Sequence, residues 1–120
     1  MSYDVHIHRA ENSFDAAESP IPREEWEKWV ADAPDFHFDT ESYVTFRYDD
    51  GERNEYLAVW TGHPRGEEFA LHYYDGTVTT GNPNEHLLRR MAEIAHDLGA
   101  RLQGDDGEFY GLDGKSLPED

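Results

Sequence analysis

The fold is decided by residues 43–80, which read YVTFRYDDGERNEYLAVWTGHPRGEEFALHYYDGTVTT. Runs rich in aromatic and β-branched residues alternate there with turn-forming residues, a pattern that is typical of strands joined by short loops. The dipeptide Asp75–Gly76 is the two-residue signal of a β-hairpin. We therefore predict an antiparallel meander whose strands are Tyr43–Tyr48, Glu55–Thr61, Phe69–Tyr74 and Thr77–Thr80.

The two faces of this meander differ in composition. Successive side chains of a strand point to opposite faces, so one apolar set is expected in the core: Val44, Phe46, Leu57, Val59, Phe69 and Leu71. The opposite set is rich in aromatic residues and consists of Tyr43, Thr45, Arg47, Tyr56, Ala58, Trp60, Ala70, His72 and Tyr74. This second face is either covered by the C-terminal segment, which we favour, or open as a recognition surface.

Two elements are predicted before the meander. Tyr3–Arg9 alternates between apolar and polar residues, which indicates a strand with one buried face. Ile21–Ala33 carries an apolar stripe at helical spacing, which predicts a short amphipathic helix. We expect Ala10–Pro20 to be a loop and Asp35–Glu41 to be a connector.

A second helix and two short strands are predicted after the meander. Asn82–Leu98 has a longer apolar stripe, with Asn82 as the expected N-cap and Gly99 as the stop signal. Ala100–Tyr110 reads as two short strands around a turn, and Gly111–Asp120 as a loose tail. With 120 residues, the chain is expected to be one domain spanning residues 1–120. The fold class is α+β: an antiparallel meander sheet of about five to seven strands with two helices packed on one face.

The charge is the most unusual property of the composition. Acidic residues number 27 against ten Lys and Arg, which gives a net charge of −17. Such a surface repels nucleic acid and anionic membranes and attracts a basic protein partner. The alternative is that the acidity serves solubility or adaptation to high salt. The absence of cysteine excludes disulfides and thiolate chemistry, and the N-terminus lacks a signal-peptide pattern, so we expect a cytoplasmic protein.

The sequence contains no motif that predicts catalysis, a metal site or a cofactor. His6 and His8 form an H-x-H pair, but further ligands are not evident, and we interpret them as solvent-facing edge histidines. Asp49–Glu52 and Asp105–Glu108 resemble calcium loops only superficially and are interpreted as turns. No nucleophile elbow, phosphate loop or dinucleotide fingerprint occurs, so an enzyme is not expected.

Several segments resemble a family of small, acidic, stand-alone bacterial α+β proteins, most of them uncharacterised. The segments are Pro20–Trp26, Ala58–Thr61, Asn82–Glu85 and Leu98–Glu108. The resemblance implies an α+β fold, and it implies neither an activity nor catalytic residues. Immunity proteins of bacterial toxin systems have the same general character, which is an analogy of size and charge alone.

The charge and the aromatic face together favour a non-enzymatic binding protein. Its most concrete form is an immunity protein or inhibitor that neutralises a basic toxin by electrostatic occlusion. The expected binding residues are Trp60, Tyr43, Tyr74, Arg47, His72, Asp49, Asp50, Glu52 and Glu55. The alternatives are a small ligand-binding or enzymatic domain, with Arg47 and His72 at a common cavity floor of the aromatic face, and a salt-adapted protein of unknown role.

Overall fold

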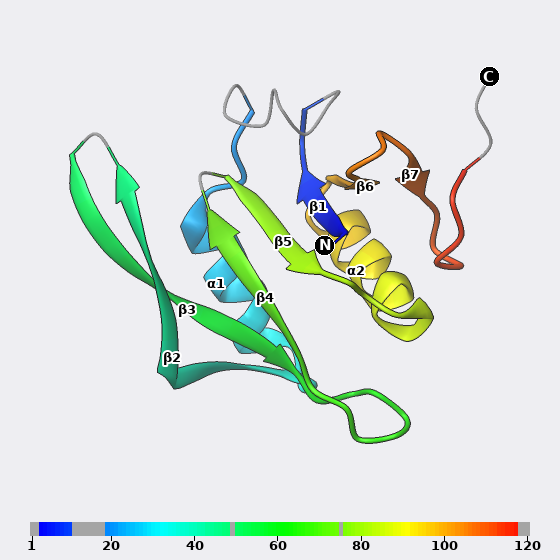
Figure 1. The fold of residues 1–120 in the computed structure, drawn as a ribbon, viewed down its shortest axis with the longest axis horizontal. Coiled ribbons are helices and arrows are strands. Elements are labelled where there is room, and N and C mark those ends of the chain that lie inside the picture. Colours follow the sequence, from blue (N-terminus) through cyan, green and yellow to red (C-terminus); the bar gives the residue numbers. More distant parts are fainter. Residues whose placement is uncertain (1–2, 11–18, 49, 75, 118–120) are drawn as a thin grey trace.

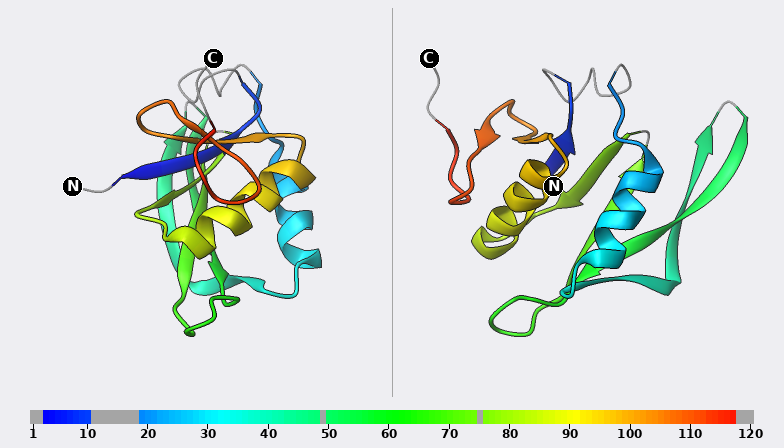
Figure 2. Two further views of the ribbon diagram at one scale, coloured as in Figure 1. Left: turned by 90° about the vertical axis from the view of Figure 1, so that its right-hand side faces the viewer. Right: turned by 180° about the vertical axis from the view of Figure 1, so that it is seen from behind.

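The computed structural model describes residues 3–10, 19–48, 50–74 and 76–117. Within these residues, a seven-stranded antiparallel sheet carries two α-helices on one face (Figure 1, Figure 2). The elements are β1 (Asp4–His8), α1 (Arg23–Asp32), β2 (Phe36–Tyr48), β3 (Gly51–Trp60), β4 (Phe69–Tyr74), β5 (Thr77–Gly81), α2 (Glu85–Asp97), β6 (Arg101–Gly104) and β7 (Phe109–Tyr110). The predicted α+β class, with both helices on one face of the sheet, is confirmed.

The sheet has the strand order β2-β3-β4-β5-β1-β6-β7. The strands β2 to β5 form the predicted meander, in which each strand pairs antiparallel with the next. The N-terminal strand β1 lies inside the sheet, because it pairs with β5 on one side and with β6 on the other. The interpretation of His6 and His8 as edge histidines is therefore wrong.

The core lies between the sheet and the two helices. Each helix buries one stripe of apolar side chains, as the spacing predicted. The buried members are Trp26 and Val30 of α1 and Leu87, Met91, Ala92, Ile94 and Ala95 of α2, and they pack with Val5 and Ile7 of β1. Burial of each large aliphatic side chain stabilises the fold by about 1.5–3 kcal/mol relative to exposure.

The strand β3 has the opposite phase from our prediction. Ala58 is fully buried and Trp60 is 5% exposed, so both belong to the core on the helix side. Ala58 lies directly opposite the buried Leu71, and residues opposite each other on paired strands point to the same face. Leu57 and Val59 therefore lie on the sheet face away from the helices, which we call the far face. The faces predicted for Leu57–Trp60 are wrong.

The C-terminal segment does not cover the far face of β3 and β4. It forms β6 and β7 at the edge of the sheet opposite to β2. In Figure 1, β6 and β7 lie to the right of β5, away from β3 and β4. The covered interpretation is therefore wrong. The side chains of Val44 and Phe46, which we assigned to the core, lie outside the described part of the structure.

Two segments also differ from the prediction. The strand β2 begins at Phe36 and not after Glu41, and its register with β3 shifts between Phe38 and Tyr43. This irregularity accommodates the polar residues that interrupt the alternation. The residues predicted as a loose tail form a hydrogen-bonded turn as far as Leu117, whose backbone N–H donates to Phe109 O at 2.7 Å. Residues 118–120 and most of the predicted loop, residues 11–18, lie outside the described residues.

The N-cap of α2 is Asn84 and not Asn82. The Asn84 side chain accepts a hydrogen bond from the backbone N–H of Leu87 at 3.0 Å. Asn82 has a φ of 48°, a left-handed conformation that Asn tolerates better than most residues. Its side chain accepts a hydrogen bond from the backbone N–H of Tyr3, so Asn82 joins the end of β5 to the start of β1.

Candidate functional site: a groove beneath a projecting hairpin

The hairpin of β2 and β3 extends beyond the rest of the sheet (Figure 1). The two strands pair from Tyr43 opposite Tyr56 to Tyr48 opposite Gly51. By contrast, the described pairs between β3 and β4 involve only the last three residues of β3, 58–60. We call the projecting part, Tyr43–Tyr56, the hairpin arm. Its β3 strand has a backbone edge that β4 does not pair.

A cavity of about 350 Å³ lies between the hairpin arm and α1. We call it the arm groove. Its lining comes from α1, β2, β3 and β4, and consists of Arg23, Trp26, Glu27, Phe38, Asn54, Glu55, Tyr56 and Tyr73. The groove therefore combines four aromatic rings with two carboxylates, one guanidinium and one amide.

The aromatic residues of the groove differ in their exposure. Trp26 and Tyr73 are buried, and the Tyr73 hydroxyl donates a hydrogen bond to Ile21 O at 2.6 Å, which fixes the ring. Tyr56 is 47% exposed and packs edge-to-face against Tyr43, which is 53% exposed, with 6.0 Å between the ring centroids. Trp26 and Tyr73 are the buried rings of the groove, and Tyr56 is its exposed ring. Tyr43 packs beside Tyr56 outside the lining, and we call this exposed pair the aromatic rim.

The groove contains an ion pair whose carboxylate is buried. Glu55 is 7% exposed and pairs with Arg23, whose guanidinium lies 6.0 Å from the centroid of the Tyr73 ring. The pairing offsets the large cost of removing a carboxylate from water. Glu55 was predicted as part of an acidic rim, and this placement is wrong because the side chain is buried. Glu27, in contrast, is exposed at the mouth of the groove.

The side chain of Trp60, the first binding anchor predicted from sequence, belongs to a hydrogen-bonded cluster inside the protein. Its Nε1 donates a hydrogen bond to Asp35 at 2.7 Å, and Arg90 donates two more to the same carboxylate at 2.8 and 2.9 Å. Burial acts to raise the pKa of Asp35, but the hydrogen bonds from Arg90 and Trp60 outweigh it and hold this pKa below its ordinary value. Trp60 thus joins β3 to α2 through Asp35, and its predicted position on the sheet face away from the helices is wrong.

The other predicted site residues are not brought together. Arg47 is largely exposed on the arm and pairs with Glu52 at 3.1 Å. His72 lies half-buried on the far face, where burial lowers its pKa. Tyr74 is on the far face too and is 36% exposed. The arm groove is lined by neither Arg47 nor His72, so it does not unite them at a cavity floor.

Acidic charge does not distinguish the arm. Asp49, Asp50, Glu52 and Glu55 are four of the 27 acidic residues, and the arm also contains two arginines, Arg47 and Arg53. Asp50 and Glu52 are exposed, and Asp49 lies outside the described residues. The arm is therefore set apart by its exposed tyrosine pair and by the groove beside it, and not by its charge.

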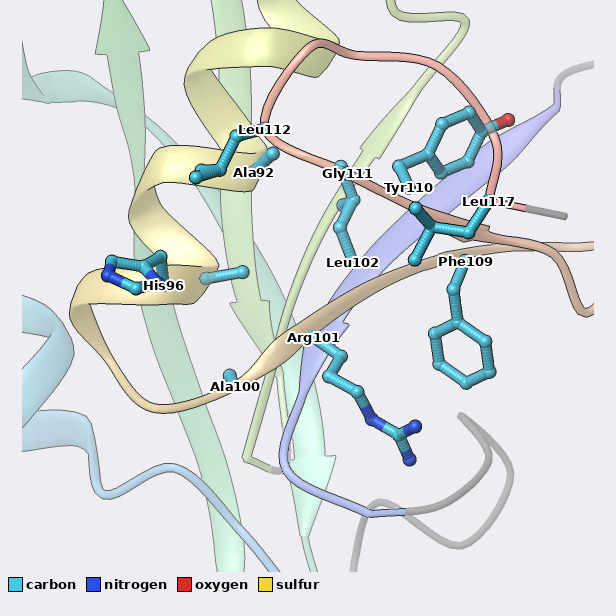
Figure 3. A pocket seen from close by; sticks show the side chains of 11 residues that line it. Ala92, His96, Ala100, Arg101, Leu102, Phe109, Tyr110, Gly111, Leu112 and Leu117 are labelled. Carbon is cyan, nitrogen blue, oxygen red and sulfur yellow. The ribbon is translucent and has the colours of Figure 1, made fainter.

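A second cavity lies at the opposite end of the sheet and has a volume of about 170 Å³ (Figure 3). It lies between α2, β6 and the C-terminal turn. Leu112 and Leu117 of that turn are 58% and 51% exposed. Arg101 points toward Phe109 in Figure 3, and its guanidinium lies 4.3 Å from the centroid of that ring. His96 is the one imidazole of this mainly apolar lining, which holds no arrangement suited to acid–base chemistry.

The paired histidines of β1 have separate partners. His8 is fully buried, its Nε2 lies 2.8 Å from Gln103 Oε1, and its Nδ1 accepts the backbone N–H of Ala10. His6 contacts Thr79 and Asp105, each at 2.9 Å. Over the part of the chain that the structure describes, no three His, Asp or Glu side chains form a group suited to a metal ion.

Most of the groove was not predicted from sequence. Only Glu55 of its lining was among the predicted binding residues, and the missed residues are Arg23, Trp26, Glu27, Phe38, Asn54, Tyr56 and Tyr73. One signal was present, because the alternating run Phe36-His37-Phe38 has the pattern of a strand and would have brought Phe38 into the sheet. The rest depends on the contact between α1 and the arm, which no local pattern encodes.

Comparisons with protein-family models, curated proteins and solved structures found no match. The resemblance to small acidic bacterial proteins therefore stays a prediction. Among the described residues, no helix combines the length and the apolar character needed to cross a membrane.

Proposed function

We propose that this protein is a non-enzymatic binding protein for a basic protein, and that it acts as an inhibitor or immunity protein of a cationic toxin. The observation that carries the proposal is the exposed Tyr43–Tyr56 pair at the rim of the arm groove, on a chain of net charge −17. Exposed aromatic residues beside a cavity are typical anchors of protein interfaces.

The mechanism has an electrostatic and an aromatic component. The negative field attracts a basic partner and raises the association rate, more strongly at low salt. The tyrosine pair and the groove then fix the complex and lower its dissociation rate. A basic active site that binds phosphates would be occluded by such a surface. The location in the cytoplasm and the exclusion of nucleic acid and membranes stay predictions from the sequence.

The test uses the full chain as immobilised bait in an extract of its native cell. Retained proteins are identified, and their binding is measured at ionic strengths from about 0.05 to 0.5 M. At the upper end of this range the screening length falls to a few ångströms, so attraction between distant charges is largely lost. We expect a basic protein whose association rate falls as salt rises. Retention of no basic protein, or association that is insensitive to salt, would contradict the proposal.

A matched pair of variants separates the arm from the overall charge. Tyr43→Ser with Tyr56→Ser removes the aromatic rim and leaves the net charge unchanged. Tyr74→Ser removes one exposed tyrosine from the far face and serves as the control. The double variant should release the partner faster, whereas the control should behave as the wild type. Equal effects of both variants would place the interface elsewhere.

The alternative of salt adaptation predicts a different result. If the acidity serves only high-salt conditions, added salt should stabilise the fold by screening self-repulsion, and no basic protein should bind. Urea unfolding at several salt concentrations measures the first effect, and the retention experiment measures the second. Salt stabilisation together with a retained basic partner would support the proposed binding function.

A further inference from the structure

We propose that the arm groove is a subsite for a guanidinium group, which in the proposed function takes an arginine side chain of the basic partner. The inference rests on that function for the identity of the partner. The guanidinium chemistry itself rests on the lining of the groove. A volume of about 350 Å³ is at the small end for ligand sites, so it suits one side chain better than a large cofactor.

Guanidinium groups already lie over aromatic rings in this protein. Arg90 lies 5.0 Å from the centroid of a Trp29 ring, and Arg101 lies 4.3 Å from that of Phe109. The groove holds a third example in Arg23, 6.0 Å from the ring centroid of Tyr73. A planar, weakly hydrated guanidinium stacks on an aromatic face better than an ammonium does. The rings of Phe38, which is partly buried, and of the exposed Tyr56 also line the groove and can stack with a guanidinium in the same way.

The carboxylates of the groove have different roles. Glu55 is buried and paired with Arg23, so its charge is already matched within the protein. Glu27 lies at the exposed mouth, and among the described residues no hydrogen bond or ion pair involves it. Glu27 is therefore the carboxylate that can accept an incoming guanidinium, while Tyr56 provides the ring beside it.

The backbone beside the groove suits an extended partner segment. Asn54, Glu55 and Tyr56 line the groove and belong to the part of β3 that β4 does not pair. Because β2 occupies one edge of β3, the remaining edge is the one on the β4 side, toward the groove. An extended segment that adds to this edge would carry every second side chain toward the same face. An arginine at such a position would enter the groove.

The test is a titration of the full chain, labelled with nitrogen-15, with N-acetyl-arginine amide at low salt. We expect amide shifts concentrated at Glu27, Asn54 and Tyr56. N-acetyl-lysine amide should bind more weakly, and N-acetyl-leucine amide should cause no shifts at these positions. Shifts spread over the whole acidic surface, or equal affinity for the lysine and arginine amides, would overturn the guanidinium subsite.

Variants connect the binding to named side chains. Tyr56→Ala should weaken the arginine amide by about fivefold, the effect expected for one exposed cation–π contact, whereas Tyr56→Phe keeps the ring and should bind as the wild type does. Glu27→Gln should weaken binding, while Glu24→Gln makes the same charge change on α1 outside the groove and should not. Amide spectra verify that each variant is folded. Equal effects of Glu27→Gln and Glu24→Gln would overturn the inference.

The outcome distinguishes this inference from the proposed function. If a basic protein is retained but N-acetyl-arginine amide does not shift the amide signals of the groove residues, the proposed subsite is wrong and the binding function stands. If the arginine amide binds with the expected variant effects but no basic protein is retained, the subsite stands and the proposed function is wrong. The ligand would then be a free guanidinium compound.

Discussion

Replacement of Asp35 by Asn removes a charge that joins three parts of the fold. Asp35 directly precedes β2, and its carboxylate accepts hydrogen bonds from Trp60 at the end of β3 and from Arg90 in α2. The side chains of Asp35 and Arg90 are 25% and 20% exposed, so solvent weakens this pair relative to a fully buried one. Breaking a fully buried pair costs about 3–5 kcal/mol, and we expect Asp35→Asn to lower the free energy of unfolding by about 2–3 kcal/mol at pH 7.

The loss of unfolding free energy in Asp35→Asn should depend on pH. The pKa of Asp35 is held below its ordinary value, because hydrogen bonds from Arg90 and Trp60 outweigh the effect of burial. The folded protein therefore binds fewer protons at this site than the unfolded chain, and the carboxylate stabilises the fold above the unfolded pKa of about 3.9. This contribution is lost as the pH falls through the folded pKa. The difference between wild type and variant should thus shrink below about pH 4.

Urea unfolding followed by tryptophan fluorescence and circular dichroism measures both effects. The control is Asp32→Asn, which makes the same chemical change at an exposed residue at the end of α1, where no loss is expected. Our reasoning about this cluster would be refuted by a loss at pH 7 no larger than that of the control. A loss that stays constant between pH 7 and pH 3 would also refute the charge-based part of it.

Three further predictions concern stability. Burial lowers the pKa of His8, so the fold should lose stability as the pH falls below about 6.5, and His8→Gln should reduce that slope in urea unfolding. In thermal unfolding, Gly76→Ala should destabilise the protein by about 1–3 kcal/mol more than Gly66→Ala. Both positions have positive φ, but a Cβ at Gly76 would lie 2.4 Å from the side chain of Pro20, whereas a Cβ at Gly66 would meet open space. Asn84→Ala should cost about 1 kcal/mol in thermal unfolding through loss of the α2 cap, because the Asn84 side chain accepts the backbone N–H of Leu87.

The fold class was predictable because the meander has strong local signals. The Asp75–Gly76 turn and the alternation of β4 placed that hairpin correctly. The phase of β3 was not predictable from the same pattern. All four residues of Leu57–Trp60 are apolar, so alternation does not say which pair is buried. The hydrogen bond from Trp60 to Asp35 helps to fix which face of β3 is buried. It joins residues 25 positions apart in the chain, so no local pattern reveals it.

The candidate site was predicted only in part. Tyr43 was named as a binding residue and is exposed, but the aromatic residue that packs against it is Tyr56 and not Trp60. The groove depends on how α1 packs beside the arm, and Arg23 and Glu55 meet there across a separation of 32 positions in the chain. Contacts of this kind follow from topology and register, which the local patterns do not contain.

The central claim is that the Tyr43–Tyr56 rim of the arm groove binds a basic protein. The most direct test is the dissociation rate of the retained partner from the wild type, from the Tyr43→Ser, Tyr56→Ser double variant and from Tyr74→Ser. We predict that the double variant releases the partner at least about tenfold faster, as expected for the loss of aromatic interface anchors, while the control is unchanged. Equal dissociation rates for all three proteins would contradict the claim.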